Sequence, residues 1–141
     1  MKVKSIIKVD VPTANNRIYT LNDLEKMVEF IQPEVLQNRC FMWFGNIHPN
    51  EMTIDNVVGI VRSIEIVDGQ AYFDIDLLDK PNKEAIIQLI NEDKLLVDFY
   101  LDAKTFEEDE NGNRHVDLSE MSMYGLSLKL ADNCVRVEEC V

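Results

Sequence analysis

The sequence contains few cysteines, glycines and histidines, and each shortage excludes a class of protein. Its 141 residues include three cysteines, five glycines and two histidines. Because no Cys-x-x-Cys pair occurs, we expect no zinc site, and we interpret Cys40, Cys134 and Cys140 as reduced thiols in a cytosolic setting. The glycines form no phosphate-binding loop, no dinucleotide fingerprint and no Gly-x-Ser-x-Gly elbow. We therefore expect neither a cofactor nor a metal.

Basic residues are also scarce. Fourteen Lys and Arg stand against 26 Asp and Glu, which gives a formal net charge of −12. This balance argues against a nucleic-acid partner and favours a basic protein surface as a partner. No apolar run is long enough to predict a membrane-spanning helix, and the alternating start MKVKSIIKVDV is typical of a strand and not of a signal peptide. The length predicts a single domain over residues 1–141.

The first half of the chain predicts strands around one helix. Residues 3–10 read as a strand because apolar and polar side chains alternate. A helix is expected to open at Thr20, where Asp23 gives a capping-box signal, and Pro33 is expected to end or break it. The apolar run at 40–44, CFMWF, predicts a short buried strand.

The second half is dominated by hairpin signals. The strand-like runs VVGIVRSIEIV and QAYFDIDLL meet at Asp68-Gly69, a strong turn signal. The segment DKPN precedes a second helix with the apolar stripe EAIIQLI, and residues 95–106 return to strand. An acidic turn with Asn111-Gly112 at its tip and several short strand-like runs follow. We predict an α+β fold, a mostly antiparallel β-barrel or sheet of about seven strands flanked by two or more helices.

Two histidines and several serines are the residues with catalytic potential. His48 lies in the loop GNIHPNEM, and a catalytic role would require a nucleophile within reach and a third group to orient its ring. From its position alone, an ordinary solvent-exposed loop histidine is the favoured interpretation. His115 lies beside the acidic turn, where a solvated histidine is again favoured. Ser122 and Ser127 lie in strand-like runs without a nucleophile motif.

The order of several short motifs resembles the capsid maturation (prohead) proteases of tailed bacteriophages. These motifs are Asn-Arg-Ile-Tyr at 16–19, Gly-x-x-His-Pro at 45–49, Leu-Leu-Asp-Lys-Pro-Asn at 77–82 and the closing DLSEMSM at 117–123. The resemblance covers roughly residues 8–138. It implies an assemblin-like fold, a β-barrel surrounded by helices, and it makes His48 the equivalent of the family's catalytic base.

The chain departs from the family where the nucleophile is expected. In the family a serine lies in a glycine-containing strand after the second helix, whereas this stretch reads KLLVDFYLDAK and has no serine, threonine or glycine. Asp98 falls at about the serine position. A carboxylate cannot replace the hydroxyl of a Ser-His pair, and the missing glycines argue against an oxyanion pocket. If His48 and Asp98 sit together, we expect a His-carboxylate pair.

Three hypotheses follow from the resemblance and the departure. We favour a catalytically inactive structural or assembly protein of the phage head, which binds capsid or scaffold proteins in the host cytoplasm. The sequence leaves open whether this protein forms homo-oligomers and whether it is retained in the virion head. The second hypothesis is an active Ser-His maturation protease, with His48 as base, Ser127 or Ser122 as nucleophile, and Glu120 or His115 as the orienting group. The third is a small acidic protein-binding module with no phage role.

Overall fold

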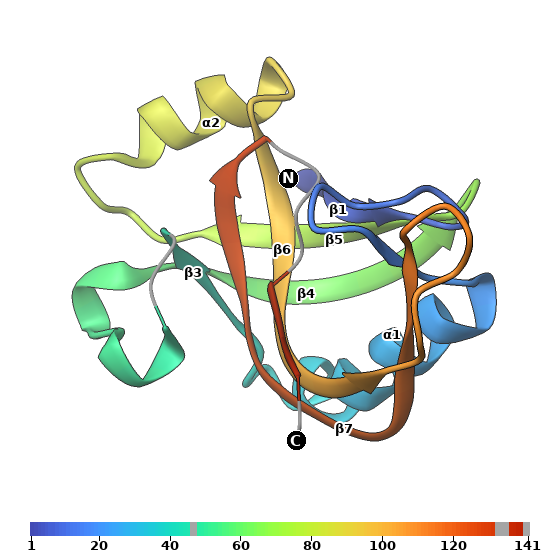
Figure 1. The fold of residues 1–141 in the computed structure, drawn as a ribbon. Coiled ribbons are helices and arrows are strands. Elements are labelled where there is room, and N and C mark those ends of the chain that lie inside the picture. The colour runs from blue at the N-terminus through green and yellow to red at the C-terminus, as the bar shows by residue number, and fades with distance from the viewer. Residues whose placement is uncertain (46–47, 132–135, 140–141) are drawn as a thin grey trace.

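A computed structural model describes residues 1–45, 48–131 and 136–139, with only the backbone described for Tyr124 and for 136–139. The described residues form an α+β fold, as the sequence predicts (Figure 1). The helices are α1 (Leu21–Leu36) and α2 (Lys83–Asn91), with short 3-10 helices at Pro49–Glu51 and Ile54–Asn56. The strands are β1 (Lys2–Lys8), β2 (Arg17–Ile18), β3 (Phe41–Phe44), β4 (Val57–Val67), β5 (Gln70–Leu77), β6 (Leu95–Thr105), β7 (Arg114–Leu130) and β8 (Arg136–Glu139).

Six of the strands close into a barrel. The order around the ring is β7-β3-β4-β5-β1-β6, and β6 pairs with β7 to complete it. Strands β2 and β8 are added outside the ring, on β7 and β6. The longest pairings, β4 with β5 and β6 with β7, are antiparallel as expected, but β3 pairs with β7 and β8 with β6 in parallel. Figure 1 shows α1 and α2 on opposite sides of these strands.

The barrel interior and the α1 interface form one hydrophobic core. Strand β5 illustrates how the sequence builds it, because Phe73 and Ile75 are buried while Tyr72 and Asp74 alternate with them and are less buried. Full burial of such a side chain contributes about 1.5–3 kcal/mol relative to exposure. The largest fully buried side chains are Tyr19, Phe73, Phe99, Ile7, Leu24, Met27, Met42, Ile75, Leu95, Leu101, Leu128 and Val61.

The start of α1 confirms the capping box expected from the sequence. The Thr20 hydroxyl accepts the N–H of Asp23 at 3.1 Å, and the Asp23 carboxylate accepts the N–H of Thr20 at 2.8 Å. Two donors that a helix leaves without intrahelical partners are thus satisfied. Leu24, Met27 and Ile31 recur at helical spacing and bury one face of α1 against the barrel.

The expectation that Pro33 ends or breaks α1 is wrong, because the helix continues to Leu36. Proline removes a single backbone donor, and the residues after it are held by other bonds. Asn38 adopts a left-handed φ of 57°, and its N–H donates to Val35 while the N–H of Arg39 donates to Glu34. This pattern is a Schellman motif, so the helix ends at its cap and not at the proline.

The hairpins form where turn residues predict them. Asp68 and Gly69 have φ values of 50° and 75°, as a two-residue turn with positive φ at both positions requires. The expected short closing strands around 114–130 are instead one 17-residue strand, β7. Register shifts opposite Tyr100/Leu101 and Asp102/Lys104 let β7 stay paired with β6, so the strand continues without a turn.

The structure tests the expectations about the cysteines and about membrane association for the described residues only. Cys40 is a buried free thiol, whereas Cys134 and Cys140 lie outside the described residues. Within the described part of the chain, neither helix has the length and apolar character needed to cross a bilayer.

Candidate functional site

The outer face of β6 and β7 brings together several of the predicted site residues. Side chains alternate along β6, so Val97 and Phe99 enter the core while Asp98 and Tyr100 lie on the other face. In the antiparallel pairing, Asp98 is opposite Ser127 and Tyr100 is opposite Gly125. Two consecutive strands therefore place a carboxylate and a hydroxyl in direct register.

A buried ion pair occupies this face. The Nζ atom of Lys129 lies 3.6 Å from Oδ2 of Asp98, and their side chains are 9% and 1% exposed. Lys129 is two residues from Ser127 on β7, so both side chains lie on the same side of the strand. Because both charges are removed from water, the pair has a stronger mutual attraction than a surface ion pair and a larger desolvation cost.

His48 caps the short helix that follows it. Its Nδ1 atom accepts the backbone N–H of Asn50 at 3.1 Å. Its ring also packs edge-on against Tyr100, with ring centroids 4.9 Å apart and an interplanar angle of 75°. Since a ring nitrogen that accepts a hydrogen bond carries no proton, the neutral imidazole holds its proton on Nε2.

The segment that carries His48 is anchored by Lys80. The Nζ atom of Lys80 donates to the carbonyl oxygens of Ile54 at 3.4 Å, Asp55 at 2.7 Å and Val57 at 2.8 Å. Lys80 lies in the connection between β5 and α2, in the motif LLDKPN. This lysine therefore ties the 3-10 helix at Ile54–Asn56, and the start of β4, to another part of the chain.

A small pocket, too narrow to hold a water molecule, lies over the same face. Its lining includes the hydroxyl residue Ser127, the ring of Tyr100 and apolar groups from the loop; the full set is Trp43, Pro49, Met52, Tyr100, Gly125, Leu126 and Ser127. Gly125 is also part of the lining, and a Cβ added there would lie 3.6 Å from the Trp43 ring. The pocket is thus next to the packed pair of His48 and Tyr100.

The other predicted site residues lie elsewhere on β7. Ser122 is exposed and in register with Asp102. Glu120 forms an ion pair with Lys104, with Nζ and Oε2 3.6 Å apart. His115 lies near the start of β7, where it pairs with Ile18 of β2. The structure therefore gathers His48, Asp98 and Ser127 around Tyr100.

Sequence reasoning missed Trp43, Tyr100 and Lys129. The period-2 pattern of LLVDFYLDAK would have placed Tyr100 on the same face as Asp98, and the pattern of LSLKL would have placed Lys129 beside Ser127. Trp43 carries no such signal, because its parallel pairing with Ser127 joins residues 84 positions apart in the chain.

We find no cation site in the described residues, since they hold no group of three His, Cys, Asp or Glu side chains that could hold a metal ion. The site also includes no glycine-rich loop that could cradle a phosphate group.

Comparisons with known proteins give a likeness in fold. No family model and no curated protein matches the sequence. A solved structure, the bacteriophage T4 capsid assembly protease gp21, matches with a TM-score of 0.60 and 14% sequence identity. The match covers 97% of this chain and 81% of that one. The chain therefore has a capsid-assembly-protease-like fold.

Proposed function

We propose that this chain is a catalytically inactive protein with a capsid assembly protease fold, and that it takes part in phage head assembly in the host cytoplasm by binding capsid or scaffold proteins. The fold likeness, which extends over 97% of the chain, supports the phage role. The observation that carries the inactive assignment is the buried ion pair between Asp98, on the strand after α2, and Lys129 on β7.

The chemistry of Asp98 supports inactivity. In a Ser-His mechanism a hydroxyl oxygen attacks the carbonyl carbon of the peptide while the histidine removes its proton. Asp98 offers a carboxylate that is 1% exposed and held by Lys129. Such a group has no hydroxyl proton to transfer, and its burial keeps it away from a polypeptide substrate.

The orientation of His48 supports the same conclusion. A catalytic histidine in a triad donates from Nδ1 to a carboxylate and accepts the nucleophile's proton at Nε2. Here Nδ1 accepts an N–H from Asn50, so the neutral ring carries its proton on Nε2. The lone pair that would serve as a base is directed at the backbone, which favours a role for His48 in capping the 3-10 helix.

The charge of the chain supports a basic partner surface. A net charge of −12 speeds association with basic patches and makes binding weaken as salt is added. The test incubates the purified protein with phage scaffold and capsid proteins, then measures complexes by size-exclusion chromatography and all masses by intact mass spectrometry. We expect uncut components and a salt-sensitive complex. Uncut components without a complex would reject the binding role, and defined cleavage products would reject inactivity.

A second candidate function, an active serine protease, is favoured by one observation. Ser127 lines the pocket next to Tyr100, and His48 packs against that same tyrosine. Labelling with a fluorophosphonate separates the two proposals, because this reagent modifies activated serines. An active enzyme would be labelled at Ser127, and both Ser127→Ala and His48→Ala would abolish the label. The exposed Ser122→Ala variant is the matched control and would keep it.

A further inference from the structure

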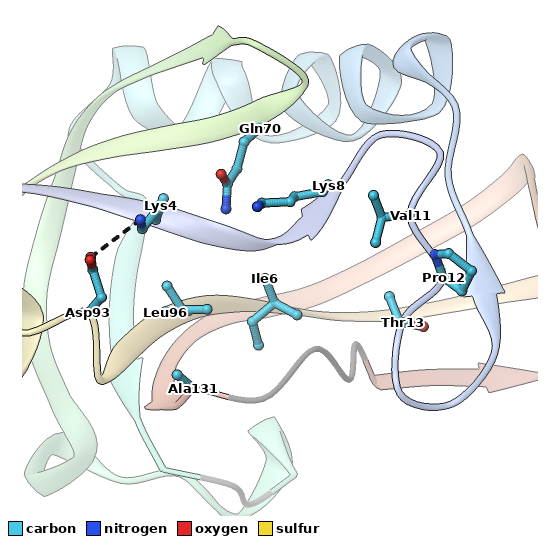
Figure 2. Close-up of a pocket in the computed structure, with 10 residues that line it drawn as sticks. All are labelled: Lys4, Ile6, Lys8, Val11, Pro12, Thr13, Gln70, Asp93, Leu96 and Ala131. Carbon is cyan, nitrogen blue, oxygen red and sulfur yellow. Dashed lines mark ion pairs between the residues drawn. The ribbon is translucent and has the colours of Figure 1, made fainter.

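A pocket that lies away from His48 is lined by ten described residues. It has a volume of about 420 Å³ and is formed by β1, the loop after it, and the ends of β6 and β7 (Figure 2). This volume is within the range of ligand-binding pockets in proteins. Its lining shares no residue with the pocket beside His48 and Ser127.

The pocket lies where the pairing of β1 with β6 is short. These strands share a single registered pair, Ser5 with Val97. The pairing of β1 with β5 is also irregular between Lys4 and Lys8. There the Ser5 carbonyl accepts the side-chain amide of Gln70 at 2.6 Å. The pocket runs along this irregular stretch of β1, and Gln70 is part of its lining.

One side of the pocket is cationic. Figure 2 shows Lys4, Lys8 and Gln70 along this side. Lys4 forms a 3.4 Å ion pair with Asp93, and these side chains are 36% and 70% exposed, so the pair is weak and open to competition. Lys8 is exposed, and among the described residues no ion pair involves it. Two lysines at one groove form a local positive site on a chain of net charge −12.

The other side is apolar. Ile6, Leu96 and Ala131 line it, and Val11 and Pro12 extend it at the end nearer β2. The loop that carries Val11 is held by backbone bonds, since the N–H of Asp10 donates to Tyr19 at 2.8 Å and that of Thr13 donates to Arg17 at 2.9 Å. Because this wall is already fixed, a ligand would bind without ordering it first.

We propose that this groove is a docking site for an extended segment of a partner protein in which two acidic side chains flank an apolar one. Charge complementarity with Lys4 and Lys8 selects acidic residues, and the wall at Ile6 and Leu96 selects the apolar residue between them. Lys4 and Lys8 are four residues apart on a strand, which corresponds to about 13 Å, so acidic residues at positions i and i+4 match their separation. The inference is independent of the proposed function.

The test titrates ¹⁵N-labelled full-length protein with acetyl-Glu-Ser-Leu-Ser-Glu-amide and follows amide shifts by NMR. We expect shifts at Lys4–Thr13 and at Leu96, and binding that weakens as salt is added. Lys8→Glu is expected to weaken the affinity about tenfold. Lys26→Glu, an exposed change of equal charge on α1, is the matched control and is expected to leave the affinity within about twofold.

Apolar recognition is tested separately. Val11 is 47% exposed, so Val11→Asp is tolerated by the fold and should weaken binding, whereas Val67→Asp, at a 42% exposed position on β4, should not. Equal affinity for the peptide with lysines in place of its glutamates, or with serine in place of its leucine, would overturn the proposal. So would equal binding of N-acetylleucine, which would assign the groove to a small anion, or peptide-induced shifts confined to the His48 region. Concentration-dependent dimerisation that excludes the peptide would assign the groove to a second copy of this chain.

Discussion

Removing the Asp98 carboxylate should destabilise the protein strongly. At 3.6 Å and an effective dielectric constant of about 20, the attraction between Asp98 and Lys129 is on the order of 4–5 kcal/mol. Asp98→Asn deletes that attraction but leaves the Lys129 ammonium 9% exposed, with little water to replace the lost partner. We therefore expect a loss of about 3–5 kcal/mol in the free energy of unfolding.

The assay is urea unfolding followed by circular dichroism. The single variant should have a lower midpoint concentration with an unchanged slope, because the folded state stays compact. The double variant Asp98→Leu/Lys129→Met removes both charges and keeps most of the volume. It should be at least as stable as the parent, and a double-mutant cycle with the single variants then gives the coupling energy of the pair.

Two results would refute this reasoning. A loss below about 1 kcal/mol for Asp98→Asn would mean that Lys129 reaches water, as in a surface pair. A double variant as unstable as the single ones would mean that the cost comes from packing and not from an unpaired buried charge.

Three further predictions concern other parts of the fold. Lys80→Met should lower the free energy of unfolding by about 1.5–3 kcal/mol and speed amide hydrogen exchange around Pro49–Asn56, because the carbonyls of Asp55 and Val57 lose a charged donor. The control variant Lys83→Met should change amide exchange in that segment little. Gly69→Ala should lower the free energy of unfolding by about 1–3 kcal/mol, since φ is 75° and the new Cβ would lie 3.2 Å from the Cβ of Val9. Thermal unfolding measures this loss, and an unchanged melting temperature would contradict the assigned turn. Burial and, to a smaller extent, the charge of Glu34 raise the pKa of Cys40 from 9.0 to about 11. The thiol should therefore resist iodoacetamide at pH 8 as long as the protein is folded, and the free energy of unfolding should fall as pH rises from 9.0 to about 11. Rapid alkylation of Cys40 in the folded protein would refute this.

Local sequence signals determined the elements of this fold. The Thr20 capping box, the Asp68-Gly69 turn and the alternating runs each act through neighbours in the chain, so they could be interpreted without a structure. Pro33 does not mark the end of α1, because that end depends on which later residue adopts a left-handed conformation. Asn38 does so, and few sequence rules identify that position.

The candidate site depended on pairings that the sequence does not specify. The resemblance to prohead proteases singled out His48 and Asp98, and their neighbours in sequence gave no indication that Ser127 would lie opposite Asp98. Two strands separated by a turn can pair in several registers, and the choice is made by burying one face in a shared core. The sequence by itself determined where most of the strands lie and where the charges lie. Only the tertiary structure decided that Lys129 meets Asp98, that the His48 ring meets Tyr100, and that β1 and β6 line one groove, because each contact joins residues distant in sequence.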